Sequence, residues 1–72
     1  MEKYLEDAKF FEKALKIYNE ELKGNLEFKT EDKGDFVVVQ AILDGIAIKF
    51  WFFGDVFQKN SIDTAKAFVE GY

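Results

Sequence analysis

The sequence lacks four residue types that carry much of protein chemistry, because its 72 residues include no cysteine, histidine, proline or arginine. Without cysteine there is no disulfide, and without histidine as well there is no ordinary zinc site. Catalysis near neutral pH usually draws on histidine as acid or base and often on cysteine as nucleophile. The turn acids Glu31, Asp32 and Asp35 lack the spacing of a calcium-binding EF-hand. We therefore expect a chain that is not an enzyme and has no cofactor or metal.

The missing arginine also limits the partners of the chain. All ten basic residues are lysine, and 14 acidic residues bring the net charge to −4. Nucleic-acid binding needs a basic face, and arginine supplies the fork that grips phosphates and guanine edges. We expect no direct nucleic-acid ligand. An acidic body is typical of a solvated surface, of a basic protein partner, or of a mimic of nucleic acid toward a protein that binds it.

Long apolar runs are absent as well. No run approaches the roughly 20 apolar residues that cross a bilayer, and "MEKYLEDAKF" is charged from its second residue, unlike a signal peptide. We expect a cytoplasmic protein that does not bind membranes.

Aromatic residues are abundant, with nine Phe, three Tyr and one Trp. A chain of this size supports one domain, here residues 1–72, and buries only about 60% of the surface of its unfolded state. Each aromatic side chain buries roughly 150–250 Å². The aromatics therefore either form a dense core or serve an interface.

Residues 2–23 have the pattern of a helix, and Gly24, which follows directly, is a natural left-handed C′ residue. The apolar stripe of the helix recurs every three or four residues and comprises Leu5, Ala8, Phe11, Leu15, Tyr18 and Leu22, widened by Tyr4 and Ala14. Phe10 and Ile17 fall beside the stripe. We expect them to form the edge of the core, the alternative being exposed contact residues.

Three strands and a second helix follow. The alternation in 25–30 and the β-branched and aromatic runs 36–43 and 46–53 predict strands, separated by turns at 31–35 and at Asp44-Gly45. Ser61 is a natural cap for a final helix. The predicted fold is α+β, a single small domain with a three-stranded antiparallel sheet (αβββα) and the helices mainly on one face.

A two-residue turn at Asp44-Gly45 predicts the register of the hairpin. The pairs on one face are Leu43–Ile46, Ala41–Ile48, Val39–Phe50 and Val37–Phe52. All eight are apolar, so we expect the helices to cover this face. The other face then carries Ile42–Ala47, Gln40–Lys49, Val38–Trp51 and Phe36–Phe53.

This second face predicts a docking surface. Exposed apolar patches mark interfaces, and a tryptophan ringed by polar groups resembles a binding hot spot. The candidate protein-binding residues are Trp51, Phe53, Phe36 and Val38 as anchors, Lys49 at the border, and Glu31, Asp32 and Asp35 toward a basic target. The alternative is that the final helix or Val56-Phe57 covers this face. A register shift of one residue would exchange the two faces.

The element order resembles the double-stranded RNA-binding domain. That family places a lysine cluster at the start of its last helix, whereas "NSIDTAKAF" has only Lys59 and Lys66 near it, so the resemblance does not imply RNA binding. In size, charge and element order the chain also resembles short phage proteins that block host defence, including some anti-CRISPR proteins. That resemblance implies a small inhibitor or regulator.

We therefore expect a protein-binding module, such as a small acidic inhibitor or regulator from a mobile element, whose partner is a basic or nucleic-acid-binding protein. Two alternatives remain. One is a homodimeric structural protein that joins through its apolar faces or third-strand edges. The other is a designed or laboratory-evolved scaffold.

Overall fold

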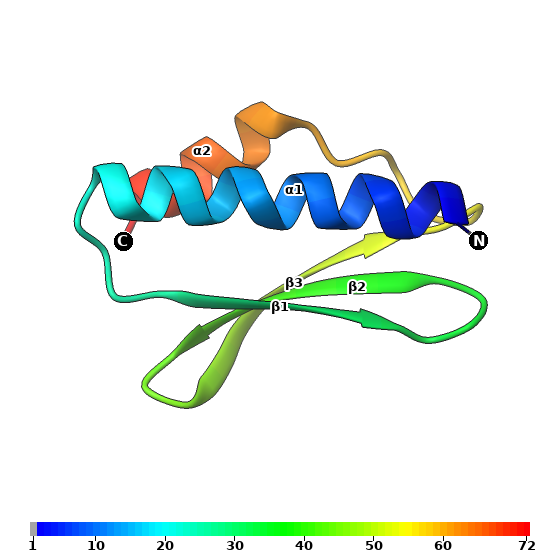
Figure 1. Cartoon of the computed structure of the whole chain (residues 1–72), viewed down its shortest axis with the longest axis horizontal. Coiled ribbons are helices and arrows are strands. Elements are labelled where there is room, and N and C mark those ends of the chain that lie inside the picture. The colour runs from blue at the N-terminus through cyan, green and yellow to red at the C-terminus, as the bar shows by residue number, and fades with distance from the viewer. Residues whose placement is uncertain (1) are drawn as a thin grey trace.

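The computed structural model describes residues 2–72 and has two layers, a sheet and a pair of helices (Figure 1). The elements are α1 (Glu2–Glu21), β1 (Glu27–Asp32), β2 (Val37–Leu43), β3 (Ile46–Phe53) and α2 (Ile62–Glu70). The sheet is antiparallel with β2 in the middle. Both helices lie on the same side of it (Figure 1). The predicted αβββα fold is confirmed.

The apolar stripe of α1 forms one half of the core. Ala8, Phe11 and Leu15 are at most 1% exposed, as the three- and four-residue spacing predicts. The expectation that Phe10 and Ile17 form the edge of this core is wrong, since they are 64% and 46% exposed. Phe10 and Phe11 are neighbours in the helix, so their side chains diverge by about 100° and only one of them can face the sheet.

The connection from α1 to β1 is held by Asn19. The helix ends at Glu21, and Lys23, rather than the expected Gly24, takes the left-handed conformation, with φ 54°. The Asn19 side chain donates to the Leu26 carbonyl at 3.2 Å and accepts from the Leu26 amide at 3.3 Å. A Cβ at Gly24 would lie 2.2 Å from the Asn19 Oδ1 atom. Glycine at 24 therefore makes room for the side chain that aligns β1.

The second helix begins at its predicted cap. Ser61 is extended, and its hydroxyl accepts a hydrogen bond from the Thr64 amide at 3.3 Å. Ala65 and Val69 are buried. The helix lies alongside the second half of α1 (Figure 1). The connection 54–61 runs alongside the first half of α1 (Figure 1).

The β2–β3 hairpin turns as predicted but does not keep the predicted register. Asp44 and Gly45 both have positive φ, 53° and 80°, which is the requirement of a type I′ turn. Next to the turn the pairing is as expected, up to Ile42 with Ala47. Ala41 then pairs with Lys49, which leaves an extra residue, Ile48, in β3.

This β-bulge exchanges the two faces of β3 beyond Ile48, because side chains alternate along a strand. Val39 now lies opposite Trp51, and Val37 opposite Phe53. The expectation that Trp51 and Phe53 face outward is therefore wrong. Phe50, predicted for the core together with Phe52, is exposed instead.

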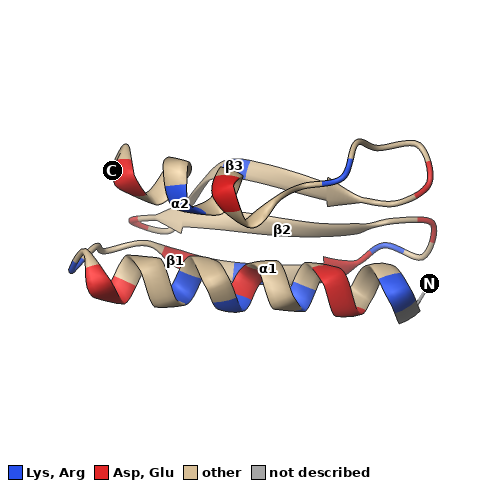
Figure 2. Cartoon of the chain, turned by 90° about the horizontal axis from the view of Figure 1, so that it is seen from above, with Lys and Arg blue, Asp and Glu red and all other residues tan. Residues whose placement is uncertain are grey.

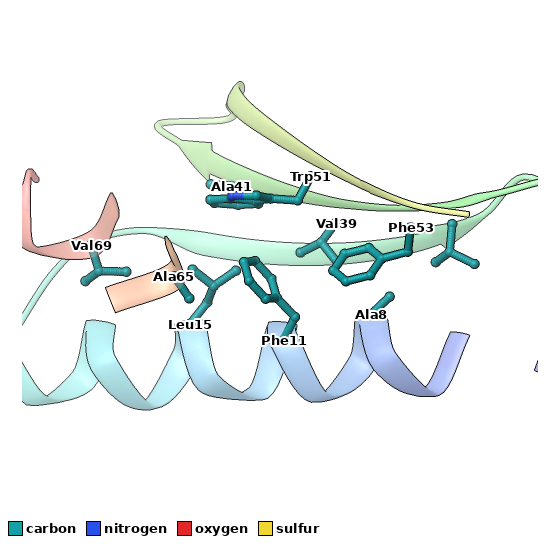
Figure 3. Close-up of a cluster of buried hydrophobic side chains, with 10 residues drawn as sticks. Ala8, Phe11, Leu15, Val39, Ala41, Trp51, Phe53, Ala65 and Val69 are labelled. Carbon is teal, nitrogen blue, oxygen red and sulfur yellow. The ribbon is translucent and has the colours of Figure 1, made fainter. Parts of the chain in front are cut away.

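The indole of Trp51 lies in the centre of the core (Figure 3). It is 3% exposed. Its ring centroid lies 5.2 Å from that of Phe11 and 5.0 Å from that of Phe68 on α2. Ala41 and Ala65 of the same cluster are fully buried, and their small side chains leave room for the indole.

Candidate functional site

The outer face of the sheet, opposite the helices, carries a cluster of aromatic rings. We call it the outer-face patch and define it by Phe36, Val38, Phe50, Phe52 and Phe57. Val38 and Phe52 are cross-strand partners on β2 and β3, and such partners share a face. Figure 1 shows both helices on the other side of the sheet. The bulge at Ile48 is the feature that directs Phe50 and Phe52 to this face.

Phe52 is the centre of the patch. Its ring stacks on Phe57 with centroids 5.1 Å apart and an interplanar angle of 23°. Phe36 lies 5.9 Å away, and Phe50 lies 6.4 Å away with nearly parallel planes. Such pairs contribute about 0.5–1.5 kcal/mol beyond the area that they bury. The patch is therefore an ordered surface in which the rings hold one another in position.

The patch remains largely in contact with solvent. Phe50, Phe52 and Phe57 are 46%, 39% and 38% exposed. Val38 beneath them is only 4% exposed, although it points away from the main core. The rings thus bury the floor of the patch and leave their own outer surfaces open. Contiguous exposed apolar surface of this kind is typical of interaction sites.

Phe57 reaches the patch from the connection between β3 and α2. Its amide donates to the Gly54 carbonyl at 3.3 Å, which closes a turn. Within this turn Asp55 accepts a hydrogen bond from the Tyr4 hydroxyl of α1, and this bond raises the pKa of Tyr4. The alternative that Val56-Phe57 covers this face is thus realised by Phe57 alone and at one end of the sheet, since Val56 is 87% exposed.

The connection also restricts the free edge of β3. Asn60 donates from its side-chain amide to the Phe52 carbonyl at 2.9 Å. That carbonyl points away from β2, where another strand would otherwise pair with it. Occupied edge groups oppose addition of a further strand. Docking is therefore favoured on the outer face rather than along this edge.

Charged side chains border the patch along β1. Glu31 lies opposite Val38 and forms ion pairs with Lys33 at 2.7 Å and Lys29 at 3.3 Å. Hydrogen bonds from Lys33, Lys29 and Gln40 lower the pKa of Glu31 to about 2. Gln40 itself lies opposite Phe50. An aromatic centre with a polar border has the anatomy of a protein-binding surface.

The structure separates the predicted site residues into three groups. Phe36, Val38 and Glu31 lie at the outer-face patch or on its border. Trp51 and Phe53 belong to the core. Lys49 pairs with Ala41 instead of Gln40 and so lies on the helix side of the sheet. The bulge causes the change of face of all three residues.

Of the two predicted aspartates, Asp32 is the last residue of β1 and Asp35 lies in the connection to β2. Asp32 accepts a hydrogen bond from the Gly34 amide at 2.9 Å and is exposed. Asp35 is also exposed and joins Phe36, Asp55, Val56 and Phe57 around a shallow hollow at the end of the patch. Asp35 therefore places negative charge beside the aromatic surface.

Sequence reasoning missed Phe50, Phe52 and Phe57 as surface residues. In "KFWFF" the two possible inward sets, Phe50 with Phe52 and Trp51 with Phe53, are equally apolar. Their pattern contains no signal for the bulge that selects between them. Phe57 follows a turn, and its contact with Phe52 depends on tertiary packing.

Among residues 2–72 no group of three carboxylates is arranged to hold a metal ion, and none of the described helices is both long and apolar enough to cross a membrane. Comparisons with protein-family models, with curated proteins and with solved structures give no match to this chain.

Proposed function

We propose that the chain is a non-enzymatic protein-binding module, a small inhibitor or regulator that docks through the outer-face patch. The observation that carries the proposal is the stacked and exposed ring of Phe52 at the centre of a face opposite both helices. Aromatic side chains dominate binding hot spots, because they bury much area at a small cost in side-chain entropy.

The patch is also preorganised for binding. Phe52 contacts three other rings, so little side-chain freedom remains to be lost when a partner docks. Preorganisation of this kind reduces the free-energy cost of association. Phe57 is fixed in the same way, because the Tyr4–Asp55 hydrogen bond anchors its turn to α1.

The acidic groups suggest the chemistry of the partner. Asp35 and Asp55 lie at the end of the patch, and neither belongs to an ion pair within the described residues. A partner that combines an apolar surface with a lysine or arginine side chain would complement both features. This supports the basic protein partner that we expect from the net charge.

A phage-displayed peptide library, selected against the immobilised chain, tests the proposal. We expect enriched peptides to carry apolar or aromatic residues and to lose at least about tenfold in affinity for a Phe52→Lys variant. The matched control is Phe10→Lys, the same chemical change at a residue that is 64% exposed on α1, away from the patch.

The two variants separate the possible results. Peptides that distinguish Phe52→Lys from the parent chain, and do not distinguish Phe10→Lys, support docking at the patch. Peptides that bind all three chains equally would contradict it, as would a selection that enriches no sequence. Circular dichroism of both variants establishes that they remain folded, which we expect because both side chains are substantially exposed.

A further inference from the structure

We propose that the outer-face patch is occupied by a second copy of this chain, so that the protein is a two-fold symmetric dimer. The inference rests on the proposed function for the surface, and in place of the basic partner it names a second copy, whose Lys29 and Lys33 supply the lysine side chains that the surface suits. Three properties of the described molecule support it: the surface that it exposes, the distribution of its charge, and the arrangement of lysine and aromatic side chains on the outer face.

The exposed surface is large for the mass of the chain. The molecule exposes 5014 Å². The usual scaling for folded monomers gives about 4,600 Å² for 8.4 kDa. This excess is what a two-layer fold with one uncovered sheet face would show.

The dimensions of the outer face indicate how strong a dimer it can form. Figure 1 is viewed along the shortest axis of the molecule, and in it the helices lie above the sheet. The outer face of the sheet therefore extends along the longest and the shortest axes, whose extents are 33 and 16 Å. Their product is about 500 Å² per copy, or about 1,000 Å² for two, near the lower limit for a specific interface. We therefore expect a weak dimer whose population depends on concentration.

The charge distribution permits two outer faces to meet. The helices α1 and α2 carry eight acidic residues and five lysines, a net charge of −3 out of the total of −4. The rest of the chain, including the sheet, has a net charge of only −1. Figure 2 shows charged residues distributed along both helices. Contact between two sheets would leave these acidic helical layers on opposite outer sides, whereas the ends that carry Asp35 and Asp55 would meet, so added salt should strengthen the dimer.

The outer face is self-complementary under one symmetry operation. Its β1 side carries Lys29 and Lys33, and its β3 side carries Phe50 and Phe52. A two-fold axis parallel to β2, between two facing sheets, lays β1 of each copy over β3 of the other. Lysine stems then cover aromatic rings and their ammonium groups lie over the ring faces, an attractive arrangement that occurs twice by symmetry.

Sedimentation equilibrium of the purified chain over a wide micromolar range tests the dimer. We expect the average mass to rise from 8.4 kDa toward twice that value with concentration. Phe52→Lys should weaken the association at least about tenfold, and Phe10→Lys should leave it unchanged. Phe50→Lys, at the most exposed ring of the patch, is a second variant in case Phe52→Lys fails to fold.

The result distinguishes this inference from the proposed function. A parent chain that stays monomeric throughout, or a dimer that both patch variants leave intact, would overturn the inference. If selected peptides still require Phe52 in that case, the patch is a docking surface for a different protein and the proposed function stands. If neither self-association nor peptide binding requires Phe52, both proposals fail.

Discussion

Trp51 is the only tryptophan of the chain, and it is buried between the sheet and the helices. Its ring contacts Phe11 of α1 and Phe68 of α2, so one side chain links three elements. The indole Nε1 atom is buried without a hydrogen-bond partner among the described residues. An unpaired buried donor costs about 1–3 kcal/mol, and the aromatic contacts must offset that cost.

Removing this side chain should be strongly destabilising. We expect Trp51→Ala to lower the free energy of unfolding by about 3–5 kcal/mol, because the substitution leaves a cavity between the sheet and the helices. Trp51→Phe should cost less, since it keeps aromatic packing and removes the unpaired donor. Urea unfolding followed by circular dichroism measures both values. The control, Phe10→Ala, should change stability by about 0.5 kcal/mol or less; an equally small effect of Trp51→Ala would contradict the packing described above.

Glu31 should make stability depend on pH. Hydrogen bonds from Lys33, Lys29 and Gln40 hold its pKa at about 2 in the folded chain, below the value of about 4.3 expected in an unfolded chain. A lowered carboxyl pKa stabilises the fold at pH above the unfolded value, and this contribution is lost as the pH falls through the folded value. The sensitive range is therefore between pH of about 4.3 and pH of about 2.

The pH prediction can be tested with Glu31→Gln. At pH 7 the variant should melt at a lower temperature than the parent chain, and the difference should disappear as the pH falls toward 2. Melting temperatures measured across this range check it, with Glu27→Gln on the same face of β1 as the control. A difference that stays constant with pH would show that the charge of Glu31 does not stabilise the fold.

At the scale of elements, the bulge at Ile48 decides what the protein presents to its surroundings. If Ile48 paired with Ala41 in a regular ladder, β3 would direct Phe50 and Phe52 toward the helices and expose Trp51 with Phe53, since the side chains of a strand alternate. With it, the indole faces Phe11 and the outer-face patch forms. One residue in one strand thus assigns the aromatic residues to the core or to the surface.

Deleting Ile48 tests this assignment. We expect the deletion variant to fold with Trp51 still buried, because Ile42–Ala47 and Ala41–Lys49 then become consecutive pairs of a regular ladder that keeps both the turn and the register of the core. Tryptophan fluorescence should stay that of a buried indole, and stability should fall by about 0.5–3 kcal/mol through loss of the Ile48 side chain, which packs against the core. Deletion of Gln58, an exposed residue of the connection before α2, is the control and should be tolerated. A deletion variant that fails to fold, or whose fluorescence shifts to the red because the indole is exposed to water, would contradict this register.

At the scale of the whole molecule, two layers leave one sheet face without a helix over it. The acidic charge is concentrated in the helical layer, and the aromatic surface lies on the opposite side. The two sides therefore differ in the partners that they suit. The sheet side favours apolar contact with another chain, whereas the helical side favours solvent or a basic surface.

Local sequence signals determined the elements. The periodicity around Phe11, the type I′ turn at Asp44-Gly45 and the cap at Ser61 each depend on neighbours within a few positions, and the structure confirms all three. The same signals indicated that an apolar sheet face would lie opposite the helices. Phe36 and Val38 were correctly expected on it.

Tertiary packing alone decided which aromatic residues complete that face. Phe50 with Phe52 and Trp51 with Phe53 are two alternating sets of apolar side chains on β3. The pattern of apolar and polar residues therefore fits a regular ladder as well as it fits the bulged one. The choice comes from the fit of Trp51 against Phe11 and Phe68, residues distant in the sequence, in the space left by small neighbours such as Ala41. Close packing in a core depends on the shapes of side chains from several elements at once, and no single strand contains that information.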